Sequence, residues 1–233
     1  MGFLLDVRDQ PAVERVLLSF KPDVIIHTAA LMRGPDMSGV NVEGSRHVAA
    51  AAASENVRLV HLSSDVIFDG EHAPYSEGDP PVPITPYAAT KTLAEQAVAQ
   101  GHPAALIVRT SLVYGFNPLD PRTRAVLAGS MPWLFTDEYR CPIFVDDLAD
   151  ALLELAGSGL TGILHVAGPQ SLNRYDFGLK LVEAFHTTPR FRPALSSSST
   201  EPRPRDCTLN TSLARRVLTT ELRSVDQVLA QIT

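Results

Sequence analysis

The 233-residue sequence has few of the features that mark secreted, metal-binding or nucleic-acid-binding proteins. It contains only two cysteines, Cys141 and Cys207, and they do not form a CxxC pair. Lysine is scarce, and the 20 lysines and arginines are outnumbered by 26 acidic residues, so the net charge is −6. We therefore expect a reduced, cytoplasmic protein that does not bind nucleic acid.

Long hydrophobic runs are also absent. The longest wholly apolar run begins at Val48 and has about six residues, far fewer than the roughly 20 of a membrane-spanning helix. The first ten residues lack the layout of a signal peptide. Apolar residues make up 45 % of the chain and charged residues 20 %, as in ordinary globular proteins. These features predict a globular protein with no membrane segment.

Segments typical of strands and helices alternate through the first half of the chain. Apolar runs without polar alternation predict buried strands at residues 23–30 and 57–64, and a third buried strand that opens the stretch 104–115. Apolar spacing and alanine-rich composition predict helices at residues 13–20, 41–55 and 87–100. Strands separated by helices of this length imply βαβ units. The predicted fold class is therefore α/β, a parallel sheet with helices on both faces.

The second half is less regular. Its pattern predicts helices at residues 146–156, 174–185 and 224–232, and a strand at residues 163–166. The polar stretch 196–205 has the composition of a mobile loop. We expect a sheet domain over residues 1–115 and a smaller α/β lobe over residues 116–233, some segments of which return to the sheet.

The strongest chemical signal is YAATK, in which Tyr87 and Lys91 lie four residues apart on a predicted helix. That spacing places both side chains on one face, one turn apart. An ammonium beside the phenol is expected to lower the tyrosine pKa and allow proton transfer near neutral pH. The alternative is an accidental pair on a solvated helix. In a chain with five tyrosines and three lysines, however, the expected number of chance Y-x-x-x-K occurrences is far below one.

Two hydroxyl groups, those of Ser63 and Ser64, lie at the carboxyl end of a predicted buried strand. In open parallel sheets, ligands bind at the carboxyl ends of the strands. A serine there is suited to polarising a carbonyl that Tyr87 protonates. Equally, serines commonly end strands with no catalytic role, and this feature alone leaves both interpretations open.

Other catalytic constellations are missing. The seven histidines show no H-x-H or HExxH spacing, so no metal site is predicted. His27, His61 and His165 fall in predicted strands and are expected to be core groups. No G-x-S-x-G motif is present, which disfavours a serine hydrolase.

Several segments together resemble one family. In chain order they include PDVIIHTAA (22–30), SSDVIFDG (63–70), YAATK (87–91), RTSLVYG (109–115) and RPRDCTLNTS (203–212). The sequence resembles the extended short-chain dehydrogenase/reductases, and more narrowly the dTDP-4-dehydrorhamnose reductase group. The resemblance implies a Rossmann-like sheet in residues 1–115 and a substrate-binding lobe in residues 116–233.

The resemblance also implies catalytic roles. Tyr87 matches the proton donor of the family, and Lys91 matches the lysine that lowers its pKa and holds the nicotinamide ribose. Ser64 matches the residue that orients the substrate carbonyl, and Asp65 lies beside it in the substrate site. Leu112 stands where many rhamnose-forming members carry a tryptophan over the sugar ring, and Arg203 matches a segment near the nucleotide sugar.

The expected cofactor is NADP or NAD, and the resemblance does not decide between them. Asp6 and Val7 match a pair that contacts the adenine. Ala29, Ala30 and Leu31 match a turn that lies along the cofactor.

The sequence departs from the family at its beginning, where the family has a strand, a glycine-rich turn and a helix that holds the pyrophosphate. The string GSGLTG (157–162) is not a substitute, because it follows a predicted helix and precedes a predicted strand. Either the natural chain is longer or this chain is a degenerate relative; we expect the first.

The sequence thus supports three hypotheses about function. The first is reduction of a keto group on a nucleotide-activated sugar, and the second is an epimerase or dehydratase on the same scaffold. The third is a non-catalytic binding or regulatory relative. The resemblance also favours a homodimer.

Overall fold

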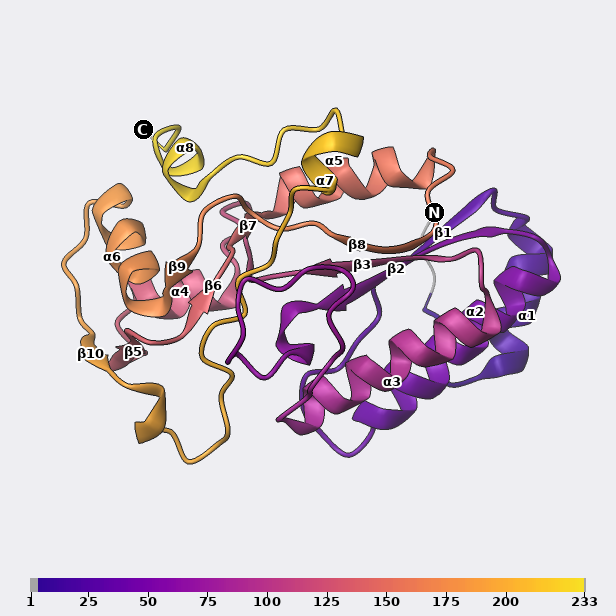
Figure 1. The fold of residues 1–233 in the computed structure, drawn as a ribbon, viewed down its shortest axis with the longest axis horizontal. Coiled ribbons are helices and arrows are strands. Elements are labelled where there is room, and N and C mark those ends of the chain that lie inside the picture. Colours follow the sequence, from indigo (N-terminus) through magenta and orange to yellow (C-terminus); the bar gives the residue numbers. More distant parts are fainter. Residues whose placement is uncertain (1–3, 233) are drawn as a thin grey trace.

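The central element of the protein is a four-stranded parallel sheet with strand order β1-β2-β3-β8. The computed structural model describes residues 4–232. The strands are β1 (Val24–His27), β2 (Arg58–Ser64), β3 (Leu106–Thr110) and β8 (Gly162–His165) (Figure 1). Because β8 comes from the second half of the chain and pairs with β3, that half returns to the sheet.

Helices cover both faces of this sheet (Figure 1). One face carries α1 (Gln10–Phe20), α2 (Ser45–Ser54) and α3 (Pro86–Gly101). The other face carries α5 (Val145–Ala156) and α7 (Ala214–Val217). The α/β fold class predicted from the strand and helix pattern is confirmed.

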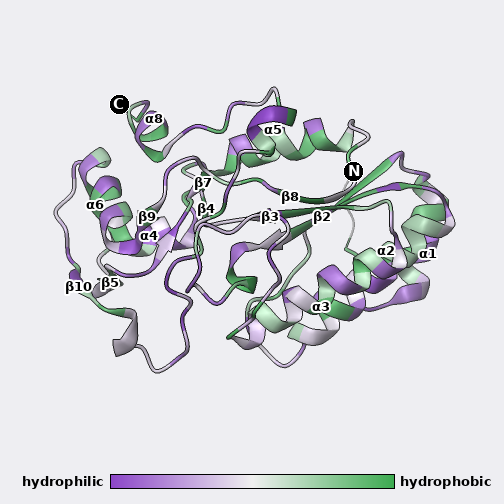
Figure 2. Ribbon diagram, viewed as in Figure 1, coloured by the Kyte–Doolittle hydropathy of each residue, from purple (hydrophilic) through white to green (hydrophobic). Residues whose placement is uncertain are grey.

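Alternating side chains along each strand fill two separate cores. On β2, Leu59 packs with α1 and α2 residues such as Leu17 and Val48, whereas Val60 packs with Leu148 and other α5 residues. Both faces of the strand are therefore apolar, which explains the unbroken hydrophobic runs in the sequence. Figure 2 shows the same strands in green between helices of mixed polarity.

The remaining elements form a lobe beside the carboxyl ends of the strands. Its helices are α4 (Pro121–Leu127), α6 (Arg174–Ala184) and α8 (Val225–Leu229). Three short pairs of strands join them: β4 (Val113–Tyr114) with β7 (Ile143–Phe144), β5 (Trp133–Phe135) with β10 (Arg192–Ala194), and β6 (Tyr139–Arg140) with β9 (Leu172–Asn173). An aromatic and aliphatic core that includes Tyr114, Phe177 and Leu181 holds the lobe together.

Two predicted segments differ in the structure. The predicted helix 41–55 begins earlier, as a π-helical segment (Gly39–Gly44) that continues into α2. The loop predicted at residues 196–205 contains a short 3-10 turn (Ser196–Ser198) and polar contacts near both of its ends, and its mobility stays a prediction. The backbone N–H and the hydroxyl of Ser196 donate to Asp137 (2.7 and 2.8 Å), and Arg203 donates to Glu138 (2.6 Å).

No helix within residues 4–232 combines the length and the apolar character needed to cross a bilayer.

Candidate active site

The predicted catalytic residues lie at the carboxyl end of the sheet. Ser64 is the last residue of β2 and lies opposite Thr110, the last residue of β3. The next residue, Asp65, begins a 3-10 turn (Asp65–Ile67) that is capped by the Ser64 side chain. The parallel arrangement therefore brings the ends of several strands to one edge, as the sequence predicted.

Asp65 is a buried carboxylate at the centre of a hydrogen-bond network. It is 2 % exposed, and its Oδ2 accepts a hydrogen bond of 2.5 Å from Ser111 Oγ. Ser64 Oγ lies 3.3 Å from its Oδ1, and Arg140 Nε lies 3.7 Å from its Oδ2. Burial raises the pKa of Asp65, while Arg140 and Ser111 oppose that rise.

Helix α3 carries both Tyr87 and Lys91. Thr85 caps the helix by accepting a hydrogen bond from the Ala88 backbone N–H, and Pro86 occupies the first turn. Lys91 is 3 % exposed and donates to the Leu62 carbonyl oxygen at 2.7 Å. Since Leu62 lies two residues before Ser64, the Lys91 ammonium is fixed against the end of β2.

The predicted lowering of the Tyr87 pKa by Lys91 is wrong. Burial, and then the negative charge of Asp65, raise the pKa of Tyr87 to about 12. Burial also lowers the pKa of Lys91 to about 8, with Glu95 acting in the opposite direction. The loss of water is the largest cause of both shifts, and Lys91 is not among the causes of the Tyr87 shift.

The turn after β1 is held by a residue that the sequence analysis missed. Asn41, which is 1 % exposed, accepts from the Leu31 N–H (2.7 Å) and donates to the Leu31 carbonyl oxygen (2.8 Å). It also donates to Thr90 Oγ1 on α3 (2.9 Å). Ala29, Ala30 and Leu31 are exposed at the sheet edge, and the backbone of Leu31 is linked through Asn41 to the helix of Tyr87. The one feature of the sequence that could have pointed to Asn41 is its place as a polar residue at the start of an alanine-rich helix.

Asp6 and Val7 lie apart from these groups, on the side of α2. Asp6 forms an ion pair with Arg8 (2.7 Å), which lowers the pKa of Asp6 to about 2. Val7 packs against Gly44, and its carbonyl oxygen lies 3.0 Å from His47 Nδ1. Within residues 4–232, no hydrogen bond or ion pair joins either residue to Ser64, Tyr87 or Lys91.

The predicted substrate residues of the lobe occupy two further places. Leu112 is half-buried against the core of the lobe, and its carbonyl oxygen accepts from the Ile143 N–H (2.9 Å). Arg203 donates through Nε to Glu138, and its guanidinium lies 4.9 Å from the centre of the Phe135 ring.

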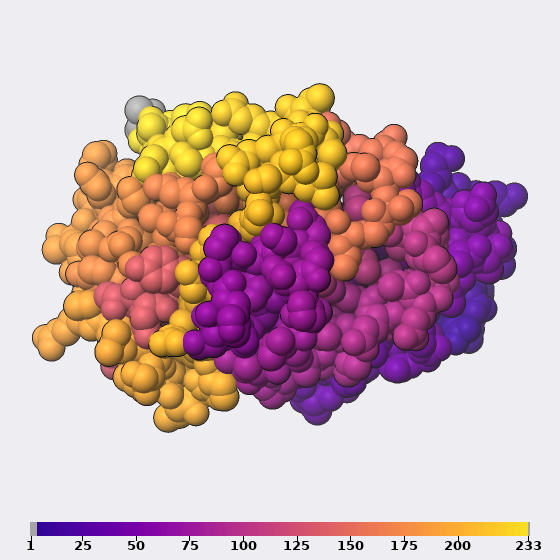
Figure 3. All heavy atoms as spheres, in the orientation of Figure 1, coloured from indigo at the N-terminus to yellow at the C-terminus, as the bar shows by residue number. Residues whose placement is uncertain are grey.

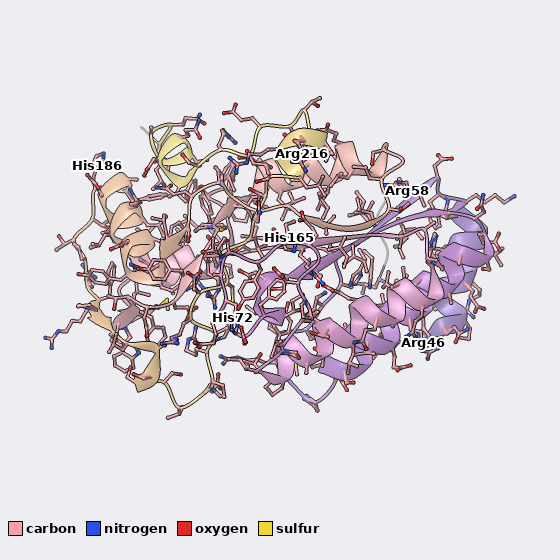
Figure 4. The ribbon with its side chains drawn as sticks, viewed as in Figure 1. Arg46, Arg58, His72, His165, His186 and Arg216 are labelled. Atoms are coloured by element: carbon pink, nitrogen blue, oxygen red, sulfur yellow. The ribbon has the colours of Figure 1, made fainter. Side chains whose placement is uncertain are left out.

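The three strand histidines are core groups. His27, His61 and His165 are buried, and Figure 4 shows His165 in the interior beside the strands. In the part of the chain that the structure describes, no group of three histidine, cysteine or acidic side chains is arranged to hold a metal ion.

The described residues fit the nicotinamide-ribose end of a dinucleotide. The Lys91 ammonium has three N–H donors, of which the Leu62 carbonyl takes one, so the others are suited to sugar hydroxyls. The exposed residues Ala29–Leu31, which follow β1, lie at the same edge. The GSGLTG string joins α5 to β8, in helix-to-strand order. Residues 4–232 contain no strand, glycine-rich turn and helix in the order that holds a pyrophosphate.

Comparison with known proteins identifies relatives over nearly the whole chain. The family model described as RmlD substrate binding domain matches residues 4–233. The dTDP-4-dehydrorhamnose reductase of Mycobacterium tuberculosis is 34 % identical over 221 residues, which cover 86 % of this chain and 71 % of that protein. Methionine adenosyltransferase 2 subunit beta of Xenopus laevis is 31 % identical over 202 residues, covering 78 % of this chain and 60 % of that protein.

A solved structure agrees with these relatives. The dTDP-4-dehydrorhamnose reductase of Bacillus anthracis, in complex with NADP, has a TM-score of 0.90 and 26 % identity to this chain. The match covers 98 % of this chain and 86 % of that chain. The family model, the relatives and the common fold agree, and the chain belongs to the RmlD substrate binding domain family.

Proposed function

We propose that the protein reduces a keto group on a nucleotide-activated sugar, with NADPH or NADH as reductant. One observation carries the proposal: the Lys91 ammonium, one helical turn from Tyr87, is bound to the strand that ends at Ser64. This constellation suits proton delivery to a carbonyl oxygen. The names of the mycobacterial relative and of the Bacillus anthracis structure, with its NADP, support the same activity.

Each side chain has a distinct part in this proposal. The Ser64 hydroxyl donates a hydrogen bond to the substrate carbonyl oxygen, and the Tyr87 hydroxyl transfers its proton to that oxygen. The bound nicotinamide supplies the hydride for the carbonyl carbon. Lys91 stabilises the resulting Tyr87 phenolate and holds the nicotinamide ribose.

The electrostatics favour the reductive direction. With a pKa of about 12, Tyr87 remains protonated at neutral pH and is ready to donate. When its proton leaves, the Lys91 ammonium, one helical turn along α3, faces a new negative charge, which favours the charged form of the lysine. Lys91 therefore stabilises the phenolate form of Tyr87, after proton transfer, more than the protonated form before it.

Other residues complete the proposed site. Asp65, Leu112 and Arg203 line the substrate, which the lobe of residues 116–233 mainly binds. Ala29, Ala30 and Leu31 lie along the cofactor, and Asp6 and Val7 receive its adenine. We also propose that the protein acts in the cytoplasm as a homodimer; analytical ultracentrifugation tests the dimer.

The deciding experiment is an assay of the Tyr87→Phe variant. We expect the full chain to oxidise NADPH or NADH in the presence of dTDP-4-dehydrorhamnose, and Tyr87→Phe to lose at least 100-fold in kcat because it has no proton to give. Tyr175→Phe, which removes a hydroxyl from the core of the lobe, is the control and retains activity. Equal rates for wild type and Tyr87→Phe would refute the assignment.

A binding or regulatory role is the second candidate. It is favoured by a specific relationship, the 31 % identity to a protein named as a subunit of methionine adenosyltransferase. This candidate predicts that Tyr87→Phe leaves the biological role intact. An epimerase or dehydratase instead predicts NAD that stays bound through purification.

A further inference from the structure

A buried line of alternating charges connects the end of the sheet with the lobe. It runs from Asp65 through Arg140 to Glu138, whose carboxylate also pairs with Arg174 and Arg203. Glu138 is 1 % exposed, and its oxygens lie 3.4 Å from Arg140 Nη2, 3.3 Å from Arg174 Nε and 2.6 Å from Arg203 Nε. Both carboxylates therefore depend on Arg140 for part of their charge compensation.

Arg140 also binds the segment 203–206 to β6. Its Nη2 donates to the Pro204 carbonyl oxygen (3.0 Å), and its Nη1 donates to the Arg205 carbonyl oxygen (3.1 Å). The Tyr139 N–H adds a backbone hydrogen bond to the Arg205 carbonyl (2.7 Å). A planar guanidinium with five N–H donors is able to bind these carbonyls and two carboxylates together.

The segment attached in this way crosses between the two halves of the molecule. The Asp206 N–H donates to the Gly70 carbonyl oxygen (3.1 Å), and the Tyr75 N–H donates to the Thr208 carbonyl oxygen (2.9 Å). In Figure 3 the chain after residue 200 lies directly against the loop that follows β2.

Arg203 is held in one orientation by its neighbours. Its Nε is bound by Glu138 and its flat face lies on Phe135. Its two terminal amino groups make no hydrogen bond to another residue within 4–232. The guanidinium therefore presents its two terminal amino groups, with four N–H donors, in a fixed direction, which suits a phosphate group.

At the other end of the line, Asp65 is held beside Ser64. Ser111 Oγ accepts from the Cys141 N–H (3.0 Å) and donates to Asp65. Arg140 and Cys141 are adjacent, so one short segment holds the Asp65 carboxylate directly through Arg140 and indirectly through Ser111. A shift of this segment would move Asp65 and Arg203 at the same time.

We propose that Arg140 is a positioning residue that keeps Asp65 and Ser64, on the sheet, in register with Arg203, on the lobe, so that both sides bind the same substrate molecule. This inference rests on the proposed function, because it assigns the Ser64 side to the sugar and Arg203 to the phosphates. Arg140 is 5 % exposed and acts through its neighbours, without touching the reacting atoms.

Two variants test the proposal. Arg140→Lys keeps the positive charge but loses the fork that binds both carbonyls, and Arg140→Met removes the charge as well. Arg205→Gln is the matched control, because Arg205 is an exposed arginine of the same segment whose side chain pairs with Glu71. Hydrogen exchange of the full chain, measured by mass spectrometry, reports the attachment of residues 203–208 without any substrate.

We expect both Arg140 variants to exchange the amides of residues 203–208 at least tenfold faster, with the amides of β2 and β3 unchanged. In assays with dTDP-4-dehydrorhamnose and NADPH, Arg140→Lys raises the KM for the sugar nucleotide at least tenfold and leaves the KM for NADPH unchanged. A merely structural ion pair would lower the amount of active enzyme without separating the two KM values.

The outcomes distinguish this proposal from the proposed function. Wild-type exchange in Arg140→Lys, or an equal rise of both KM values, overturns the positioning role. Arg205→Gln with the same exchange as Arg140→Lys also overturns it. Failure of the wild type to reduce the sugar overturns the proposed function, while the exchange measurement still decides whether Arg140 attaches the segment.

Discussion

At the scale of single residues, the most consequential group is the Lys91 ammonium. Its pKa of about 8 means that it loses its proton just above physiological pH, whereas an exposed lysine does so above pH 10. The proposed reaction needs the charged form. We therefore expect kcat/KM for ketone reduction to fall as the pH rises through about 8, and Lys91→Met to lose activity by roughly 100-fold or more and to lack this fall.

Steady-state rates between pH 6 and 10 measure this dependence. Lys180→Met is a suitable control, because Lys180 forms a half-exposed ion pair with Asp226 in the lobe. It should retain both the activity and the alkaline fall. An unchanged fall near pH 8 in Lys91→Met would mean that another group titrates.

The identities of the candidate site residues were largely readable from the sequence, whereas their electrostatics were not. Tyr87 and Lys91 are neighbours because helical spacing is local. The pKa of Tyr87 depends on Asp65, 22 positions earlier in the chain, and on burial by the fold. Asn41 and Arg140 escaped notice for the same reason, since their partners lie up to 65 positions away.

At the scale of elements, α3 is the carrier of the proposed chemistry. Its first turn depends on Thr85, whose hydroxyl oxygen accepts the Ala88 N–H at 3.1 Å. We expect Thr85→Ala to lower the free energy of unfolding by about 1 kcal/mol, because the N–H of Ala88 loses its partner. Urea unfolding followed by circular dichroism measures the change.

A matched substitution elsewhere in the helix distinguishes the loss of the cap from the change in helix propensity that alanine brings. Gln96→Ala changes an exposed position in the middle of α3 and should leave stability unchanged or slightly higher. A loss in Gln96→Ala equal to that in Thr85→Ala would argue against the capping interpretation.

Elements with strong local signals were predictable, and those defined by distant pairing were not. Pro86 and Gly101 mark the ends of α3, and continuous apolar runs mark β2 and β3. The strand predicted to open the stretch 104–115 ends at Thr110, and later in the same stretch Val113–Tyr114 pairs separately with Ile143–Phe144. That change of partner depends on a segment about 30 residues later in the chain. The local spacing of apolar residues carries no information about such a distant partner.

At the scale of the whole molecule, buried neutral histidines link stability to pH. Burial, and then the positive charge of Lys91, lower the pKa of His27 to about 4, and burial lowers that of His165 to about 4. Burial also lowers the pKa of His61. Between pH 6.5 and 4 the unfolded chain therefore binds protons that the folded chain does not, so stability falls as the pH falls through this range.

Urea denaturation at pH 7, 6 and 5 measures this effect. The slope of unfolding free energy against pH is proportional to the number of protons taken up on unfolding. We expect His27→Gln to reduce that number by up to one, because one titrating group is gone. His72→Gln replaces a histidine whose side chain is 80 % exposed and should leave the slope unchanged. The same slope in wild type and His27→Gln would assign the pH dependence to other groups.

The return of β8 to the sheet has a consequence for biosynthesis. β3 is complete at Thr110 and its first partner, β2, precedes it, but its second partner, β8, begins only at Gly162. At ordinary translation rates, roughly 3 to 10 s separate their emergence from the ribosome. During that interval the edge of β3 is open to other nascent chains, so a ribosome-associated chaperone that binds residues 104–110 would protect the protein until β8 pairs with β3.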